Sequence, residues 1–149
     1  MQTSASGSNK GFTLLEVLLV LVIGGLLMAV VATSLSEGPV LRKSSREVAT
    51  SLRHARAQAV MRQQPVVWKM DIKAKRFWID GGDKDADRNL NQAMEAKINT
   101  SAAEVISADQ GGIRFFPDGS STGGSVDLTY KKQTYKVNVE WVTGRVSIQ

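Results

Sequence analysis

An uncharged stretch of twenty residues, Val17–Ser36, constrains this 149-residue chain more than any other feature. An α-helix needs about twenty predominantly apolar residues to cross the hydrocarbon core of a bilayer. An acidic residue, Glu16, stands directly before the stretch, at the end of the run Lys10-Gly11-Phe12-Thr13-Leu14-Leu15-Glu16. A carboxylate in a spanning helix costs roughly 2.5–3.5 kcal/mol near the bilayer centre and less near an edge. We therefore expect Glu16 to have a cationic partner.

A cut between Gly11 and Phe12 would supply that partner, because the new α-amine of Phe12 lies one helical turn from Glu16. Two other interpretations compete with this one. Val30-Val31-Ala32 satisfies the small-residue cleavage pattern of an ordinary secretory signal peptide, although the apolar run is longer than is usual there. The segment is also compatible with a plain single-span anchor. Neither alternative explains Glu16.

These residues resemble the class III signal of type IV pilins and type II secretion pseudopilins. The resemblance rests on a short basic leader, Gly11, Phe12, Glu16 at the fifth place of the mature chain, and the uncharged run. It implies that a membrane-embedded prepilin peptidase removes residues 1–11 as a leader peptide and N-methylates Phe12. It also implies that Glu16 pairs with the N-terminal amine of a neighbouring subunit during filament assembly. Residues 12–37 are then the transmembrane helix, anchored in the cell inner membrane.

The basic residues around this segment argue against an orientation with the N-terminus in the cytoplasm and the C-terminal domain in the periplasm. Lys10 precedes the span, whereas Arg42, Lys43, Arg46 and Arg53 follow it. The positive-inside rule alone would place the C-terminal part in the cytoplasm. The leader motif requires the N-terminus inside, so we give the motif precedence and expect the C-terminal domain in the periplasm.

A second, amphipathic helix is predicted over residues 38–64. Pro39 cannot donate to the carbonyl of Leu35, which predicts a kink or break at Gly38-Pro39. Pro65 is expected to end the helix. Apolar residues recur at helical spacing along it, and such a stripe usually packs on a globular core. The stripe consists of Leu41, Val48, Leu52, Ala55 and Ala59.

Residues 65–149 read as a small antiparallel β-sandwich, because apolar and polar residues alternate with a period of two. Residues 81–111 are expected to be an insertion or variable loop, with a weak helical patch near Leu90–Lys97. Aromatic side chains of the strands are interpreted as core or subunit contacts. The predicted strands are 66–72 and 76–79, which form a hairpin, then 113–116, 126–130, 135–141 and 145–148.

Three segments are similar to the GspH/FimT domain: Ser51–Val60, Ile113–Ser120 and Thr143–Val146. The likeness covers nearly all of the chain beyond the leader. It implies an α+β fold, in which a long kinked N-terminal helix with a transmembrane first half precedes the sandwich. It further implies a minor pseudopilin of the H type, a structural subunit at or near the tip of the periplasmic pseudopilus of a type II secretion system. Implied partners are the I, J and K type pseudopilins, the major pseudopilin, the prepilin peptidase and the inner membrane.

A FimT-like minor type IV pilin that binds DNA for uptake is the alternative. The charge distribution makes nucleic acid a less suitable partner. Residues 40–64 carry six basic side chains against Glu47, whereas residues 65–149 carry twelve basic and eleven acidic ones. No aromatic residue interleaves with the arginines of the helix, so anionic lipid headgroups or acidic neighbours fit better.

The sequence offers little for catalysis or metal binding. It has no cysteine, one histidine and no nucleophile motif, so no enzyme activity and no cofactor are expected. Asp83, Asp85, Asp87 and Asn89 occupy positions one, three, five and seven of a calcium-loop template. The sixth position, where the template needs glycine, is Arg88, and the twelfth is methionine instead of glutamate. We interpret the segment as a solvated acidic turn and keep Ca²⁺ as the minor alternative.

Overall fold

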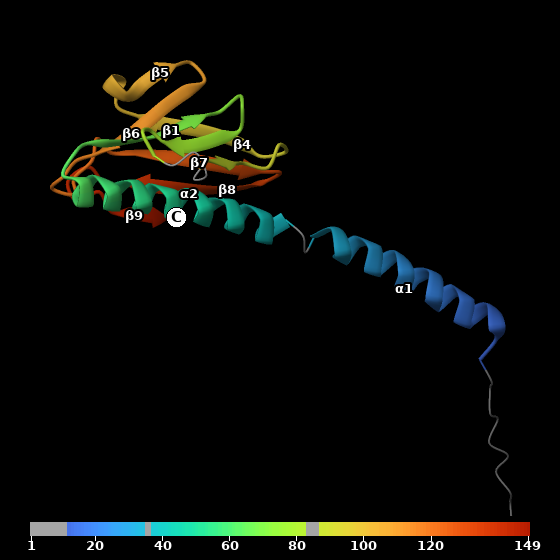
Figure 1. The fold of residues 1–149 in the computed structure, drawn as a ribbon. Helices are drawn as coiled ribbons and strands as arrows, with labels where there is room; N and C mark the ends of the chain where they lie inside the picture. The colour runs from blue at the N-terminus through green and yellow to red at the C-terminus, as the bar shows by residue number, and fades with distance from the viewer. Residues whose placement is uncertain (1–11, 35–36, 83–86) are drawn as a thin grey trace, which may run out of the picture. The chain divides into compact units, whose positions relative to one another are not determined.

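The computed structural model describes residues 12–34, 37–82 and 87–149. They belong to two compact units, Met1–Ser36 and Glu37–Gln149. The first unit contains helix α1, Leu14–Ser34. The second contains helix α2, Glu37–Arg62, and two antiparallel β-sheets (Figure 1). The predicted α+β class, with N-terminal helices followed by antiparallel sheets, is confirmed.

The ends of α2 differ from the prediction. The chain forms two helices, as an interruption near Gly38-Pro39 would require, but α2 begins at Glu37 and holds Pro39 in its first turn, so the expected position of the break is wrong. The first N–H groups of a helix have no intrahelical partner, which is why proline is tolerated there. The helix also ends at Arg62, before Pro65. Gln63 adopts the left-handed conformation of a helix C-cap (φ 53°), and its side chain donates to the Val60 carbonyl at 2.7 Å.

The first sheet has the strand order β3-β2-β1-β6-β5. Strands β1 and β2 form the predicted hairpin, in which Trp68 pairs with Ile79 and Asp71 with Arg76. The predicted strand at 113–116 is the second half of β6. The five strands are β1 (Val66–Asp71), β2 (Arg76–Ile79), β3 (Arg88–Asn89), β5 (Val105–Ser107) and β6 (Gln110–Phe115).

The second sheet has the order β4-β7-β8-β9. Its strands are β4 (Glu95–Thr100), β7 (Gly124–Tyr130), β8 (Gln133–Val139) and β9 (Val146–Ile148). Strands β7, β8 and β9 confirm the three C-terminal strands that the alternating pattern predicts. Strand β8 stops before Trp141, however, which the pattern had included.

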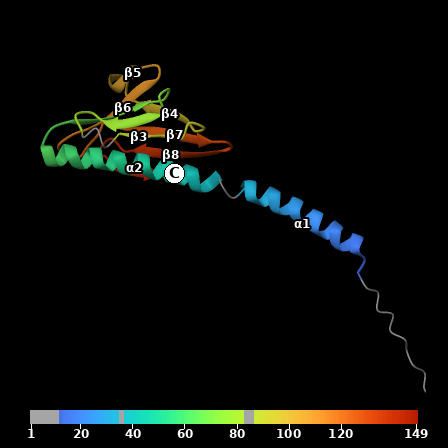
Figure 2. The same cartoon turned by 45° about the vertical axis from the view of Figure 1, so that its right-hand side comes forward.

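Helix α2 contacts strands of both sheets and closes one continuous core. Figures 1 and 2 show α2 running along the sheets, with β8 beside it in both views. All five residues of the predicted apolar stripe are fully buried, which confirms that the stripe packs on the core. Opposite it, the rings of Trp68 and Phe77 lie 5.6 Å apart, and the Trp68 indole donates to the Ser51 hydroxyl at 3.0 Å.

The expected loop with a helical patch over residues 81–111 is wrong where the structure describes the segment. The segment contains β3, β4, a short 3-10 helix (Ala102–Glu104) and β5, and no α-helix covers Leu90–Lys97. Glu95 and Lys97 are exposed, whereas Ala96 and Ile98 are only half-buried, so the alternation of this edge strand is weak. Its first three residues, Glu95, Ala96 and Lys97, are good helix formers in isolation. Pairing with β7 overrides that propensity.

Candidate functional site

The predicted assembly residues lie at the start of α1. The backbone N–H of Glu16 donates to the Thr13 carbonyl at 3.0 Å and to the Thr13 hydroxyl at 3.2 Å. Thr13 and Glu16 thus have the spacing of a helix capping box. Glu16 lies in the first helical turn, where the helix dipole favours a negative charge. Phe12 is 81% exposed one residue before the cap, and Gly11 lies outside the described residues.

Helix α1 exposes apolar side chains in every direction. Each described side chain from Phe12 to Met28 is exposed. A helix that is apolar all round is found where lipid or other protein surrounds it. Within the part of the chain that the structure describes, no helix reaches the combined length and apolarity required to cross a membrane. The transmembrane assignment of residues 12–37 therefore stays a prediction.

The acidic turn is only partly described. Asp83 and Asp85 lie outside the described residues, and Asp87 is exposed. Met94, at the position where a calcium loop needs a bidentate glutamate, is completely buried in the core. Among the described residues, no group of three or more His, Cys, Asp or Glu side chains is placed to hold a metal ion.

Several basic side chains of α2 form hydrogen bonds within the domain, which the sequence did not indicate. Arg56 Nε donates to the carbonyls of Gly119 at 3.0 Å and Thr143 at 3.1 Å. Arg53 donates to the Val146 carbonyl at 3.1 Å. Arg56 thereby joins two turns to the helix and to each other. Residues 113–120 and 143–146, which carry the family resemblance, supply these turns.

The other basic side chains of α2 divide into two pairs. Arg42 contacts the Tyr135 hydroxyl at 3.4 Å, which raises the pKa of the guanidinium, and Arg62 contacts the Gly81 carbonyl at 3.4 Å. Lys43 and Arg46 are exposed, and neither has a hydrogen bond or ion pair with any residue that the structure describes. Four of the six basic residues of the predicted cluster are therefore engaged by the domain itself.

A cleft arises where the chain changes sheets before β7. Thr122 still belongs to the first sheet, because its N–H donates to the Arg114 carbonyl at 2.9 Å. Gly124 begins β7 in the second sheet. Glycine is needed at this crossing: Gly123 and Gly124 have φ values of 72° and 146°, and a Cβ on Gly124 would lie 2.6 Å from the Asn99 carbonyl oxygen.

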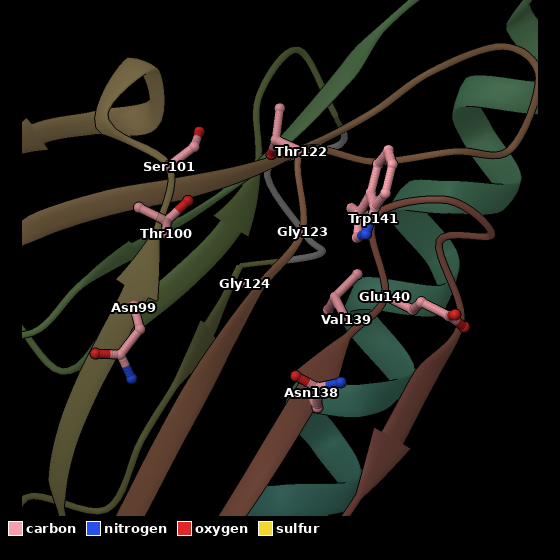
Figure 3. A pocket seen from close by; sticks show the side chains of 10 residues that line it. All are labelled: Asn99, Thr100, Ser101, Thr122, Gly123, Gly124, Asn138, Val139, Glu140 and Trp141. Carbon is pink, nitrogen blue, oxygen red and sulfur yellow. The ribbon is translucent and has the colours of Figure 1, made fainter.

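The cleft has a volume of about 550 Å³ and opens between the ends of β4 and β8 (Figure 3). Six of its ten lining residues are polar by type, although apolar atoms contribute the larger part of the lining surface, and Glu140 is the charged residue among them. Trp141 stands at its edge with 69% of its surface exposed. The sequence analysis missed this site because its three segments lie between 14 and 42 residues apart. The Thr143-Gly144 turn was the available signal that β8 ends early. The lining comprises Asn99, Thr100, Ser101, Thr122, Gly123, Gly124, Asn138, Val139, Glu140 and Trp141.

Comparison with known proteins places these features in a family. Residues 44–144 match the family model described as "Type II transport protein GspH". The chain belongs to the GspH family. Residues 7–32 also match the model of the prokaryotic N-terminal methylation motif. The GspH-family chain is 38% identical over 141 residues to "Type II secretion system protein H" of Xanthomonas campestris pv. campestris, covering 92% of this chain and 81% of that protein.

Solved structures share the fold of this GspH-family chain. The minor pseudopilin EpsH from the type 2 secretion system of Vibrio cholerae matches with a TM-score of 0.57 and 14% identity, over 73% of this chain and 95% of that one. The type IV minor pilin FimU of Pseudomonas aeruginosa matches with a TM-score of 0.55 and 15% identity, over 73% and 87%. A fold common to a pseudopilin and a pilin agrees with the predicted architecture.

Proposed function

We propose that this chain is a minor pseudopilin, a structural and non-catalytic subunit at or near the tip of the periplasmic pseudopilus of a type II secretion system. The observation that carries the proposal is the combination of two matches in one chain. The GspH model covers the globular domain, and the N-terminal methylation motif covers the segment with Phe12 and Glu16. The similarity to a type II secretion system protein H supports the secretion system rather than a pilus.

In this account a prepilin peptidase cuts after Gly11 and methylates Phe12. Residues 12–37 hold the subunit in the inner membrane as a single span, and residues 38–149 lie in the periplasm. On assembly, α1 exchanges lipid for the helices of the I, J and K type pseudopilins and of the major pseudopilin. Apolar packing is non-directional. The pairing of Glu16 with a neighbour's N-terminal amine therefore sets the axial register.

Three of the arginines that follow the predicted span have contacts within the domain, which gives them a role that does not depend on the side of the membrane. Arg53 and Arg56 donate to backbone carbonyls, and Arg42 contacts Tyr135. Lys43 and Arg46 have no such contact with a described residue. The contacts of the three arginines support giving the leader motif precedence over the positive-inside rule.

Two substitutions of Glu16 separate its charge from its place in the helix cap. Glutamine at this position of a capping box also bonds the helix start, so Glu16→Gln keeps the helix but cannot form an ion pair. We expect Glu16→Gln and Glu16→Ala to insert in the membrane and to lose copurification with the other pseudopilins to a similar degree. Thr13→Ala, which removes the cap hydroxyl and keeps the charge, is the control. Normal secretion and copurification in Glu16→Gln would refute the pairing.

A further inference from the structure

Trp141 differs from the other aromatic residues of the globular unit. Among the described Phe, Tyr and Trp residues of 37–149, Trp141 is exposed, whereas the others are buried or half-buried. Its turn is nevertheless well fixed, because Gly144 N–H donates to the Glu140 carbonyl at 2.9 Å and Glu140 N–H donates to the Arg145 carbonyl at 3.0 Å. Arg56 holds the same turn from α2. A preorganised aromatic side chain loses little conformational entropy on binding.

The cleft beside Trp141 offers groups that complement a peptide backbone. Asn99 and Asn138 lie on opposite sides of the Gly123–Gly124 segment (Figure 3). A carboxamide carries both donors and an acceptor, as a peptide group does. The Asn138 carboxamide has no hydrogen bond to any described residue, whereas the Asn99 amide donates to Ser125 and Asp127, which leaves its carbonyl oxygen available. The cleft, with a volume of about 550 Å³, is wide and open to solvent, so it can take a segment that lies along the surface.

The negative charge of Glu140 restricts which ligands the cleft can bind. Glu140 is the charged side chain among the lining residues, and its carboxylate also accepts a hydrogen bond from the Thr143 hydroxyl at 2.8 Å. An acidic segment would be repelled by this carboxylate, whereas an uncharged or basic one would not.

The cleft also lies at one end of the domain. Arg56, which holds the Thr143 turn, follows Glu37 by 19 residues, or roughly 28 Å of helix. The turn and the cleft beside it are therefore at the end of α2 opposite to the one where the chain enters from α1. This end of the domain is therefore distant from the residues that join the domain to α1.

We propose that this cleft binds an extended, uncharged or basic peptide segment of a neighbouring pilin-like subunit, with an apolar side chain of that segment packed on Trp141. The proposal rests on the proposed function, because it takes its ligand from the filament. It assigns the polar groups of Asn99 and Asn138 to the peptide backbone, and it assigns the exposed indole to the side chain.

Site-specific photo-cross-linking in cells tests this surface in the full chain. A benzophenone amino acid is placed at one of three positions. Position 141 reports on the cleft, and position 19 in α1 reports on filament incorporation. Position 106 is the control, because Ile106 is also apolar and 51% exposed but lies on β5 of the other sheet. Cross-linked products are identified by mass spectrometry of their peptides.

We expect positions 19 and 141 to cross-link to pilin-like subunits, and position 106 to give little such product. With the probe at position 138, Trp141→Ala should lower the yield of the cross-link to the same subunit by roughly 30-fold, as for an interface tryptophan that acts as a hot spot. Products at position 19 but none at 141, or a glycan in place of a peptide at 141, would overturn the docking proposal and leave the proposed function intact. Products at neither 19 nor 141 would overturn both.

Discussion

Replacing Arg56 by alanine should release two turns that are far apart in sequence. The Arg56 Nε–H group is shared between the carbonyls of Gly119 and Thr143, which lie 63 and 87 residues away. Both acceptors belong to tight turns, since Gly119 and Gly144 have positive φ values of 85° and 60°. Without the guanidinium, α2 loses its polar connection to both turns.

The expected loss of folding stability in Arg56→Ala can be estimated from these hydrogen bonds. One charged N–H shared between two acceptors counts as about one charge-assisted hydrogen bond, worth roughly 1.5–3 kcal/mol. The carbonyls are partly accessible to water, which lowers the cost, whereas loss of the packed side-chain stem raises it. We expect the free energy of unfolding to fall by about 2 kcal/mol. For a domain of this size the melting temperature should fall by roughly 6–10 °C.

The measurement is urea unfolding of residues 37–149, followed by tryptophan fluorescence. This segment contains every residue of the core, from Leu41 to Val146. Arg46→Ala is the matched control, because Arg46 lies on the same helix, is exposed and has no partner among the described residues. It should change stability by less than about 0.5 kcal/mol. If Arg56→Ala is as stable as Arg46→Ala, the reasoning about the two turns is wrong.

Three further outcomes are expected. Gly144→Ala should destabilise the domain by about 1–3 kcal/mol in the same urea assay, because φ is 60° and the new Cβ would collide with the Gly119 carbonyl; unchanged stability would contradict this. Hydrogen bonds from the Ala74 N–H and the Gln110 side chain lower the pKa of Asp71 in the folded protein. The carboxylate therefore stabilises the fold above its unfolded pKa of ~3.9, and this stabilisation is lost as pH falls through the lower folded pKa. Asp71→Asn should therefore show a smaller loss of urea midpoint than the wild type in that acid window, and equal losses would refute the assignment. Gel-shift titration of residues 37–149 with duplex DNA at two salt concentrations should show no steeply salt-dependent binding; such binding would favour the FimT-like alternative.

The sequence predicted those parts of the fold in which burial produces a strong period. Leu41, Val48 and Leu52 recur at helical spacing because one face of α2 is covered by both sheets. The alternation of Tyr135, Val137 and Val139 likewise predicted β8. These signals are strong because each buried position excludes polar residues.

Features that depend on distant partners could not be predicted in this way. Strand β4 forms by pairing with β7, although its first three residues favour a helix. Pro39 fits within α2 because the helix starts two residues earlier, which its sequence does not mark. The partners of Arg56 are backbone carbonyls, which every residue has, so no residue type points to them. The cleft at Trp141 depends on where one strand ends and another begins.

The candidate assembly segment was more accessible to sequence reasoning, because its chemistry is local. Phe12, Thr13 and Glu16 lie within one turn, and a carboxylate beside an uncharged run is a strong constraint in itself. The structure adds the cap that the Thr13 hydroxyl provides to the backbone N–H of Glu16. The proposed pairing with a neighbour's amine concerns a second chain.

The mass of the intact protein isolated from cell membranes tests the central claim most directly. The account predicts a mass equal to residues 12–149 plus one methyl group, and fragmentation should place that methyl group on the Phe12 amine. A mass that retains residues 1–11, or one that begins beyond Ala32, would contradict the account. In either case the cationic terminus that Glu16 is proposed to meet would not exist.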